Sequence, residues 1–382
     1  MADLWLSLLK SAARKKEINT RTLWILGGSN LLRKQFIDKL IDSAKSKSFF
    51  VQSSAETQVN SFGLSYAYAD IYDREHEELI LRLNIYTLSS VAETLAPLLV
   101  DLLKRDETML EDLLVVLLGD WDEPRRLIRD LAHSILFLRD KIFTTLDPEI
   151  KSRALQICSN RYQRLHNISF TETYQPSSKL SGIEMPLGMG ELDAPLGVDI
   201  AVAVMNADHI DILERKYGRK DDEFDFIQQF LRTILLKHGA SLIYLSTESH
   251  QLFTFIHYLI SPSLESDMSR DLVVETSRQV KPNVVDREAV LIPSGWDSWS
   301  KILVIKGSFD ADGVSSSWTS EVLGDEGEQA SVIEVYEEVV HAFGGKPIGL
   351  YKEDEEGIEI KPLSSQEFLK SQLNELNSIE AK

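Results

Sequence analysis

The stretch Thr22–Asn30 reads TLWILGGSN, an apolar run that ends in two glycines, a serine and an asparagine. A helical pattern follows from about Leu31 to Ala44. A strand, a glycine turn and a helix in this order open most nucleotide-binding α/β domains. We therefore expect these residues to form the first strand and the first helix of such a domain.

Alternating apolar and polar residues mark the next two segments, Ser65–Ile71 and Leu79–Tyr86. The short charged stretch between them indicates a turn, so we expect an antiparallel hairpin. Solid apolar runs later in the chain are typical of strands covered on both faces, and they span residues 113–118, 198–205 and 241–245. Helical patterns accompany them at about 91–104, 122–143, 147–165, 223–237 and 249–260.

This alternation predicts an α/β fold with a mostly parallel sheet covered by helices on both faces. The strands stand in the order of a Ras-like G domain, the P-loop NTPase type. We divide the chain into an N-terminal helix at 1–20 and a Ras-like G domain at 21–306, with a long loop or insertion at 171–197. A C-terminal extension at 307–382 ends in a helix at Ser364–Leu376.

The charge of the chain argues against several partners. Sixty acidic and 41 basic residues give a formal net charge of -19 at pH 7. A surface of that sign repels nucleic acid and anionic lipid, and no apolar run is long enough for a membrane span. One cysteine, Cys158, excludes an internal disulfide and a cysteine zinc site, and the histidines lack a metal-binding spacing. We expect an intracellular protein with no metal, no nucleic acid and no direct membrane insertion.

The glycine turn can be compared with the phosphate-binding motif GxxxxGK[ST]. The first glycine and the lysine of that motif are present as Gly28 and Lys34, and Gly27 precedes them. Arg33 replaces the second glycine, and Gln35 replaces the hydroxyl that binds magnesium. An arginine adopts positive φ only at a cost, and its side chain would crowd a phosphate. The alternative is that the two glycines form a simple strand-to-helix turn.

Two further nucleotide motifs are also damaged. The acid and glycine of DxxG are missing after Tyr86, where magnesium and the γ-phosphate would be organised. The base-recognition motif [NT]KxD is reduced to Met205, Asn206, Ala207 and Asp208, in which only the acid survives. We therefore expect a G-domain scaffold without catalysis and without a bound cofactor. Weak GDP or phosphate binding through Lys34, and an NTPase with an unorthodox phosphate loop, stay open as alternatives.

Two strings in the second half of the chain closely resemble the light intermediate chains of cytoplasmic dynein. The first is FDFIQ at Phe224–Gln228, continued by Leu231-Arg232 and by GASLIY at Gly239–Tyr244. The second is IPSGWD at Ile292–Asp297. The LWLSLL helix near the N-terminus and the EFL and QL residues of the last helix are similar to the helices that open and close the family's globular domain, so the resemblance spans nearly the whole chain.

The resemblance implies a non-catalytic subunit of the dynein motor, in the cytoplasm and on microtubules. It implies a Ras-like domain that binds the dynein heavy-chain tail, and cargo adaptors bound by a helix in a C-terminal tail. We expect that tail beyond this chain, which is either a shortened piece or lacks it for another reason. Aromatic and aliphatic residues are the candidate heavy-chain anchors: Trp5, Leu9, Trp296, Trp299, Phe368 and Leu373. The alternative is that all six are core residues, but Trp299, flanked by serines, is expected to be exposed.

Overall fold

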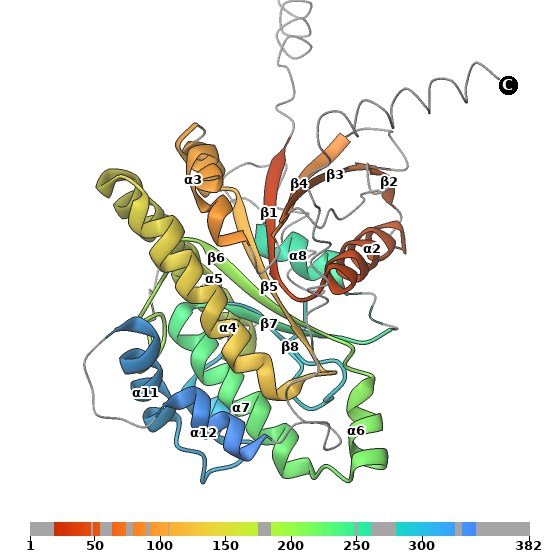
Figure 1. Ribbon diagram of the computed structural model, residues 1–382, viewed down its shortest axis with the longest axis vertical. Helices are drawn as coiled ribbons and strands as arrows, with labels where there is room; N and C mark the ends of the chain where they lie inside the picture. Colours follow the sequence, from red (N-terminus) through yellow and green to blue (C-terminus); the bar gives the residue numbers. More distant parts are fainter. Residues whose placement is uncertain are drawn as a thin grey trace, which may run out of the picture. The chain divides into compact units, whose positions relative to one another are not determined.

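A computed structural model describes the part of the chain that carries the fold (Figure 1). The described residues are 19–46, 49–53, 63–73, 79–88, 92–105, 107–174, 185–247, 249, 251–260, 280–324 and 331–340. All of them belong to one compact unit, Met1–His341, and the second unit, Ala342–Lys382, lies outside them.

Eight described strands form one sheet in the order β2-β3-β4-β1-β5-β6-β7-β8. The strands are β1 Thr20–Gly27, β2 Phe49–Ser53, β3 Leu64–Asp73, β4 Leu79–Leu88, β5 Leu113–Asp120, β6 Asp199–Met205, β7 Ser241–Leu245 and β8 Leu291–Ile292. The pairs within β4-β1-β5-β6-β7 are parallel, and β2, β3 and β8 join antiparallel. The predicted mostly parallel sheet and the predicted β3–β4 hairpin are confirmed.

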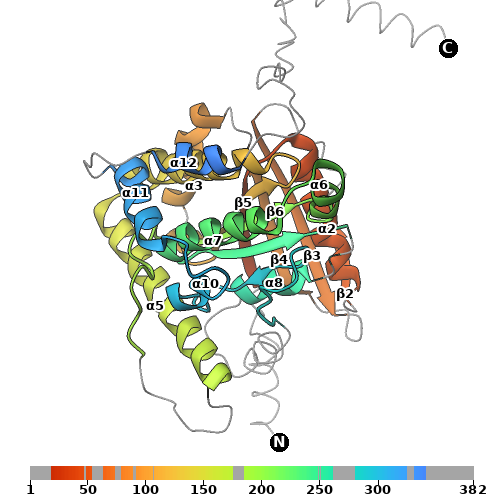
Figure 2. The same cartoon turned by 90° about the horizontal axis from the view of Figure 1, so that it is seen from below.

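Helices cover both faces of this sheet (Figures 1 and 2). The α-helices are α2 Asn30–Ser46, α3 Ala96–Arg105, α4 Leu127–Leu136, α5 Pro148–Tyr174, α6 His209–Tyr217, α7 Asp221–His238, α8 Leu252–Ile260, α10 Trp299–Leu303, α11 Ala311–Leu323 and α12 Val332–Val339. Shorter helical turns are η1 Ala92–Leu95, η2 Glu107–Leu110, η3 Pro124–Arg126, the π-turn η4 Phe137–Ile142, and η5 Phe143–Thr145. Helices α2 and α8 lie on one face, and α4, α5 and α7 lie on the other.

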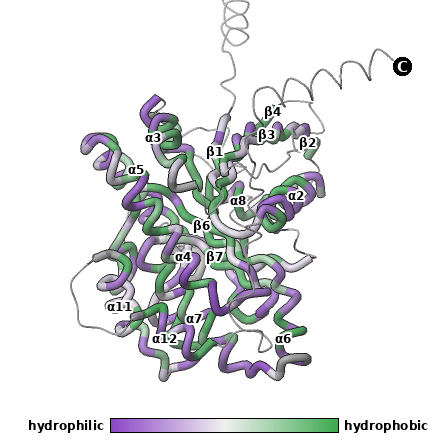
Figure 3. Tube along the Cα trace, viewed as in Figure 1, coloured by the Kyte–Doolittle hydropathy of each residue, from purple (hydrophilic) through white to green (hydrophobic). Residues whose placement is uncertain are grey.

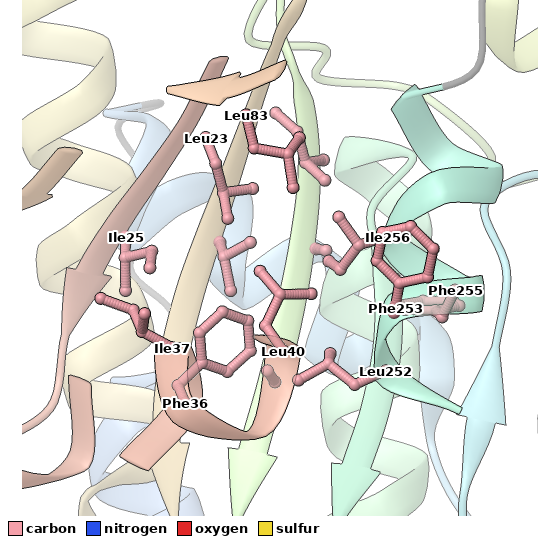
Figure 4. Packing of buried hydrophobic residues seen from close by; sticks show 14 of the residues in the cluster. Leu23, Ile25, Phe36, Ile37, Leu40, Leu83, Leu252, Phe253, Phe255 and Ile256 are labelled. Atoms are coloured by element: carbon pink, nitrogen blue, oxygen red, sulfur yellow. The ribbon is translucent and has the colours of Figure 1, made fainter. Parts of the chain in front are cut away.

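The two cores follow from the alternation of side chains along each strand. Leu23 and Ile25 of β1 point toward α2 and α8, where they pack with Phe36, Leu40 and other buried side chains (Figure 4). Trp24, between them in sequence, is fully buried on the opposite face. Figure 3 shows the hydrophobic colour along the central strands and hydrophilic stretches on outer helices such as α5. The sheet is therefore covered on both faces at its centre.

Several boundaries differ from the sequence-based prediction. Helix α5 continues to Tyr174, past the predicted end at about residue 165 and into the segment predicted as a loop at 171–197. Residues 185–197 of that segment contain no helix or strand. Strand β2 and helices α6, α11 and α12 were not predicted. Helices α11 and α12 contact α7 and α4, so both helices pack on the same unit as the sheet.

Among the residues that the structure describes, no helix is both long and apolar enough to cross a membrane.

Candidate functional site

The turn between β1 and α2 is tight, and helix α2 begins before the position of the motif lysine. Gly27 has a φ of 80° and Gly28 a φ of 63°, backbone conformations that strongly favour glycine. Helix α2 begins at Asn30, four residues before Lys34. The hydroxyl Oγ of Ser29 accepts a hydrogen bond from the backbone N–H of Leu32 at 3.2 Å, which caps the first turn. A phosphate loop needs these residues to be irregular, with their amides free to face the anion.

The side chain of Arg33 is buried inside this turn and binds its backbone. Its side chain is 3% exposed, and its Nη1 donates hydrogen bonds to the backbone oxygens of Gly27 at 2.9 Å and Gly28 at 2.6 Å. Its Nη2 donates to Oδ1 of Asn30. Burial lowers the pKa of Arg33 to about 10, so the guanidinium still carries its charge at neutral pH. The two glycines thus direct carbonyl oxygens at a cation of the protein itself, where a phosphate loop would direct N–H groups at an anion.

Lys34 and Gln35 lie on the exposed side of α2. A helix separates successive side chains by about 100°, so burying Arg33 against the glycines directs the next two residues outward. The structure therefore brings Arg33, and not Lys34, to the glycine turn. The side chain of Leu32 also occupies the turn, since a Cβ at Gly28 would lie 2.7 Å from Leu32 Cδ2.

The carboxyl ends of β5 and β6 are joined by an acid that the sequence-based prediction missed. Oδ1 of Asp120 accepts hydrogen bonds from Nδ2 of Asn206 at 2.8 Å and from the backbone N–H of Asp122 at 3.0 Å. Burial raises the pKa of Asp120 above its ordinary value. Asn206 has a φ of 59°, an uncommon conformation that asparagine tolerates better than most residues. The available signal was an acid two residues after the buried run 113–118.

Asp208, the surviving acid of the base-recognition motif, is engaged with the end of β7. Its Oδ2 accepts from Oγ1 of Thr247 at 2.8 Å, and its Oδ1 accepts from the backbone N–H of Thr247 at 3.3 Å. Burial acts to raise the pKa of Asp208, but these hydrogen bonds and the nearby His209 lower it overall. Lys39 of α2 donates to the backbone oxygen of Ser246 at 2.8 Å and to that of Thr247 at 3.2 Å. Polar groups at this edge thus satisfy one another.

Met205, which stands where the motif begins, is fully buried at the end of β6. Its backbone oxygen accepts a hydrogen bond from the N–H of Trp121 at 3.0 Å, which is also fully buried. Neither side chain is available to a ligand. Within the described residues, no group of three or more His, Cys, Asp or Glu side chains could hold a metal ion.

The strings LR, GAS and IPSGWD meet in one place. Arg232 of α7 and Asp297 form a two-pronged ion pair, with Nε–Oδ2 at 2.7 Å and Nη2–Oδ1 at 2.6 Å. Their side chains are 1% and 8% exposed. Ser294 donates from Oγ to the backbone oxygen of Gly239 at 2.7 Å, and Oγ of Ser241 accepts from the Ser294 N–H at 2.9 Å. These bonds fasten the GWD turn to the end of α7 and the start of β7.

The two tryptophans of this turn are partly covered by the protein itself. Trp299 is half-buried at the start of α10, which Ser298 caps, so its predicted exposure is wrong. Its indole packs on Gly190, where an added Cβ would lie 2.3 Å from Nε1. Trp296 is also half-buried, and Nζ of Lys301 lies 4.2 Å from its ring centre. Trp5, Leu9, Phe368 and Leu373 lie outside the described residues.

A family model for the dynein light intermediate chain (DLIC) matches residues 40–321. The chain belongs to the dynein light intermediate chain family. It is 25% identical over 256 residues to cytoplasmic dynein 1 light intermediate chain 1 of Homo sapiens, covering 65% of this chain and 46% of the human protein. It is 24% identical over 355 residues to the Dictyostelium discoideum protein of the same name, covering 79% of this chain and 64% of that one.

A solved structure is also similar, the crystal structure of the dynein light intermediate chain's conserved domain. It superposes with a TM-score of 0.67 and 31% identity, covering 86% of this chain and all of that chain. The predicted Ras-like fold is confirmed by this match. The chain spans about half the length of the curated relatives that it matches, 46% for the human protein.

Proposed function

We propose that the chain is a non-catalytic accessory subunit of the cytoplasmic dynein motor, a Ras-like scaffold that works without nucleotide. The observation that carries this proposal is Arg33, whose buried guanidinium holds the carbonyls of Gly27 and Gly28. A phosphate entering the turn would have to break these bonds and separate the helix cap at Ser29. The Arg33 side chain would also be displaced from its buried position.

Two groups that serve NTP hydrolysis and one that recognises the base are displaced, replaced or engaged elsewhere in the described site. The lysine of the motif faces solvent, and glutamine stands where a hydroxyl would bind magnesium. The acid that would pair with guanine, Asp208, is bonded to Thr247. Electrostatic stabilisation of the transferred phosphoryl group depends on such positioned cations, and it has no source here. The exposed Lys34 retains only the capacity for weak GDP or phosphate binding.

The partners follow from the family. We propose that the chain binds the dynein heavy chain in the cytoplasm, on the microtubule cytoskeleton, and that cargo adaptors bind a C-terminal tail beyond this chain. The candidate heavy-chain anchors stay Trp5, Leu9, Trp296, Trp299, Phe368 and Leu373, and of these Trp296 and Trp299 are half-buried in the described structure. The net charge of -19 disfavours nucleic acid and anionic lipid as partners.

The test is mass spectrometry of nucleotide released from purified protein, together with co-purification of the heavy-chain tail after nucleotide has been stripped. We expect no stoichiometric nucleotide, no hydrolysis and unchanged heavy-chain binding. The matched variant restores the phosphate-binding motif by Arg33→Gly and Gln35→Thr. Nucleotide bound by this variant would show that the assay detects bound nucleotide. Tightly bound GTP with magnesium in the natural chain would contradict the proposal and favour an NTPase with an unorthodox loop.

A further inference from the structure

Buried polar atoms without a hydrogen-bond partner gather beside the GWD turn. Within the described residues, ten buried side-chain atoms have no such partner. Five of them belong to residues that meet around this turn, and these residues are Tyr162, His166, Glu191, Arg232 and Trp299. A buried polar group that stays without a partner costs folding free energy. Half of the orphaned atoms in one place therefore indicate a bound molecule that supplies the missing hydrogen bonds.

A small cavity lies at this place, between α5, α7 and the GWD turn. Its volume is about 10 Å³, which is room for one water molecule and for nothing larger. Tyr162, Arg232 and Asp297 line it with polar side chains, and the rest of its lining is leucine, isoleucine, alanine, proline and glycine. The ring of Tyr162 packs on Gly239 at the end of α7, where an added Cβ would lie 2.9 Å from Cδ2 of the ring.

Two side chains bring uncommitted hydrogen-bonding atoms to this cavity. Nε and Nη2 of Arg232 bind Asp297, whereas its Nη1 is buried and has no partner among the described residues. The hydroxyl of Tyr162, on α5, is buried and unpartnered in the same way, and the whole residue is 3% exposed. Burial raises the pKa of Tyr162, and the nearby carboxylates of Glu191 and Asp297 raise it further, so the hydroxyl keeps its proton.

The charges around the cavity favour a neutral ligand. The charge of Arg232 is already matched by Asp297, and the carboxylate of Glu191 is near, so an anion would be repelled. A cation would face the N–H groups of a guanidinium. Oδ2 of Asp297 accepts one hydrogen bond from Arg232, and a carboxylate oxygen has capacity for a second. Water finds here the two to four polar partners that a buried water molecule needs.

We propose that this cavity binds one ordered water molecule. The water accepts hydrogen bonds from Nη1 of Arg232 and from the hydroxyl of Tyr162, and it donates one to the carboxylate of Asp297. It thereby joins α5 to α7 and to the GWD turn, with bonds that are nearly as favourable in enthalpy as direct ones. The site is independent of the proposed function, and either can fail without the other.

A high-resolution crystal structure of the chain, from crystals soaked in bromide, tests the site directly. We expect a density peak without anomalous signal within about 3.2 Å of both Nη1 of Arg232 and the hydroxyl oxygen of Tyr162. An empty cavity, or a peak that contacts only one of these atoms, would overturn the proposal. An anomalous bromide peak would overturn it in favour of an anion.

Two tyrosine-to-phenylalanine variants test the site in solution. Tyr244 is the matched control, because it is 3% exposed, its hydroxyl has no partner within the described residues, and it does not line the cavity. Tyr162→Phe removes a partner of the water and should lower the folding equilibrium constant about tenfold. Tyr244→Phe removes a hydroxyl that bonds to nothing, so stability should stay the same or rise.

Magnetic relaxation dispersion of the water oxygen, which detects long-lived internal water, gives a second readout. Tyr162→Phe should lose the contribution of one such water molecule, because the remaining partners release it faster, while Tyr244→Phe should match the natural chain. Equal changes of stability in the two variants would overturn the proposal, since both hydroxyls would then be alike. An unchanged dispersion in Tyr162→Phe would overturn it too.

Discussion

Replacing Asp297 with asparagine should be among the most damaging single changes in the fold. The substitution keeps the shape of the side chain but removes the charge that faces Arg232, whose side chain is 1% exposed. Breaking a buried ion pair from one side costs about 3–5 kcal/mol, because the remaining charge is left uncompensated in the interior. A typical domain has a free energy of unfolding of only about 5–15 kcal/mol. At about 2–4 °C per kcal/mol, the expected fall in Tm is on the order of 10 °C.

Thermal and urea unfolding followed by circular dichroism measure this loss. The control is Arg215→Ala, which removes an ion pair to Asp211 whose side chains are 80% and 46% exposed. That exposed pair should contribute less than about 0.5 kcal/mol. Replacing both buried partners, as Arg232→Met with Asp297→Leu, should recover much of the loss, since two apolar side chains leave no buried charge. A loss below about 1 kcal/mol for Asp297→Asn would refute the reasoning, and so would a double variant as unstable as the single one.

Three other outcomes follow from the structure. Burial lowers the pKa of both His238 and His257 to about 4, against about 6.5 when unfolded, so each binds its proton more readily in the unfolded chain. The stability that the two neutral histidines contribute to the folded chain is fully present above pH 6.5 and is lost as pH falls toward 4. Tm should therefore drop as pH is lowered across this window, and it should drop less steeply in His238→Gln. Cys158, whose pKa burial raises to about 12, should resist a maleimide reagent in the native chain and react within minutes in urea; rapid native labelling would contradict this. Replacing Trp5 and Leu9 by aspartate should abolish co-purification with the heavy-chain tail while circular dichroism stays native, and retained binding would place the contact elsewhere.

Local periodicity was enough to predict the central sheet. Strand β7 has the predicted bounds, Ser241–Leu245, because five buried residues in a row admit little else. The glycine turn and the hairpin were also read correctly, since both depend on neighbours in sequence. Strand β2 was missed because Phe49–Ser53 is short, and an edge strand depends on pairing with β3 rather than on its own pattern.

The site was harder to predict than the fold. Sequence alone marked Arg33 as an obstacle to phosphate, but it did not place the guanidinium on the carbonyls of Gly27 and Gly28. That placement depends on where α2 begins, which Ser29 decides through its cap. Trp299 was expected in solvent because serines flank it, yet Gly190, more than 100 residues earlier, provides the surface that it packs on. Contacts between distant segments leave no local periodicity to detect.

The buried guanidinium of Arg33 has a consequence for timing. A Ras-like domain usually acts as a timed molecular switch, because the γ-phosphate of GTP orders its switch loops and hydrolysis releases them. A cation that is covalently part of helix α2 cannot be hydrolysed, exchanged or diluted. Under the proposed function, in which the chain works without nucleotide, the domain has no on and off states set by the cell's GTP, and its affinity for a partner does not follow the GTP supply. The same proposal then places the timing of assembly and release outside this fold, in modification or in the supply of the partner itself.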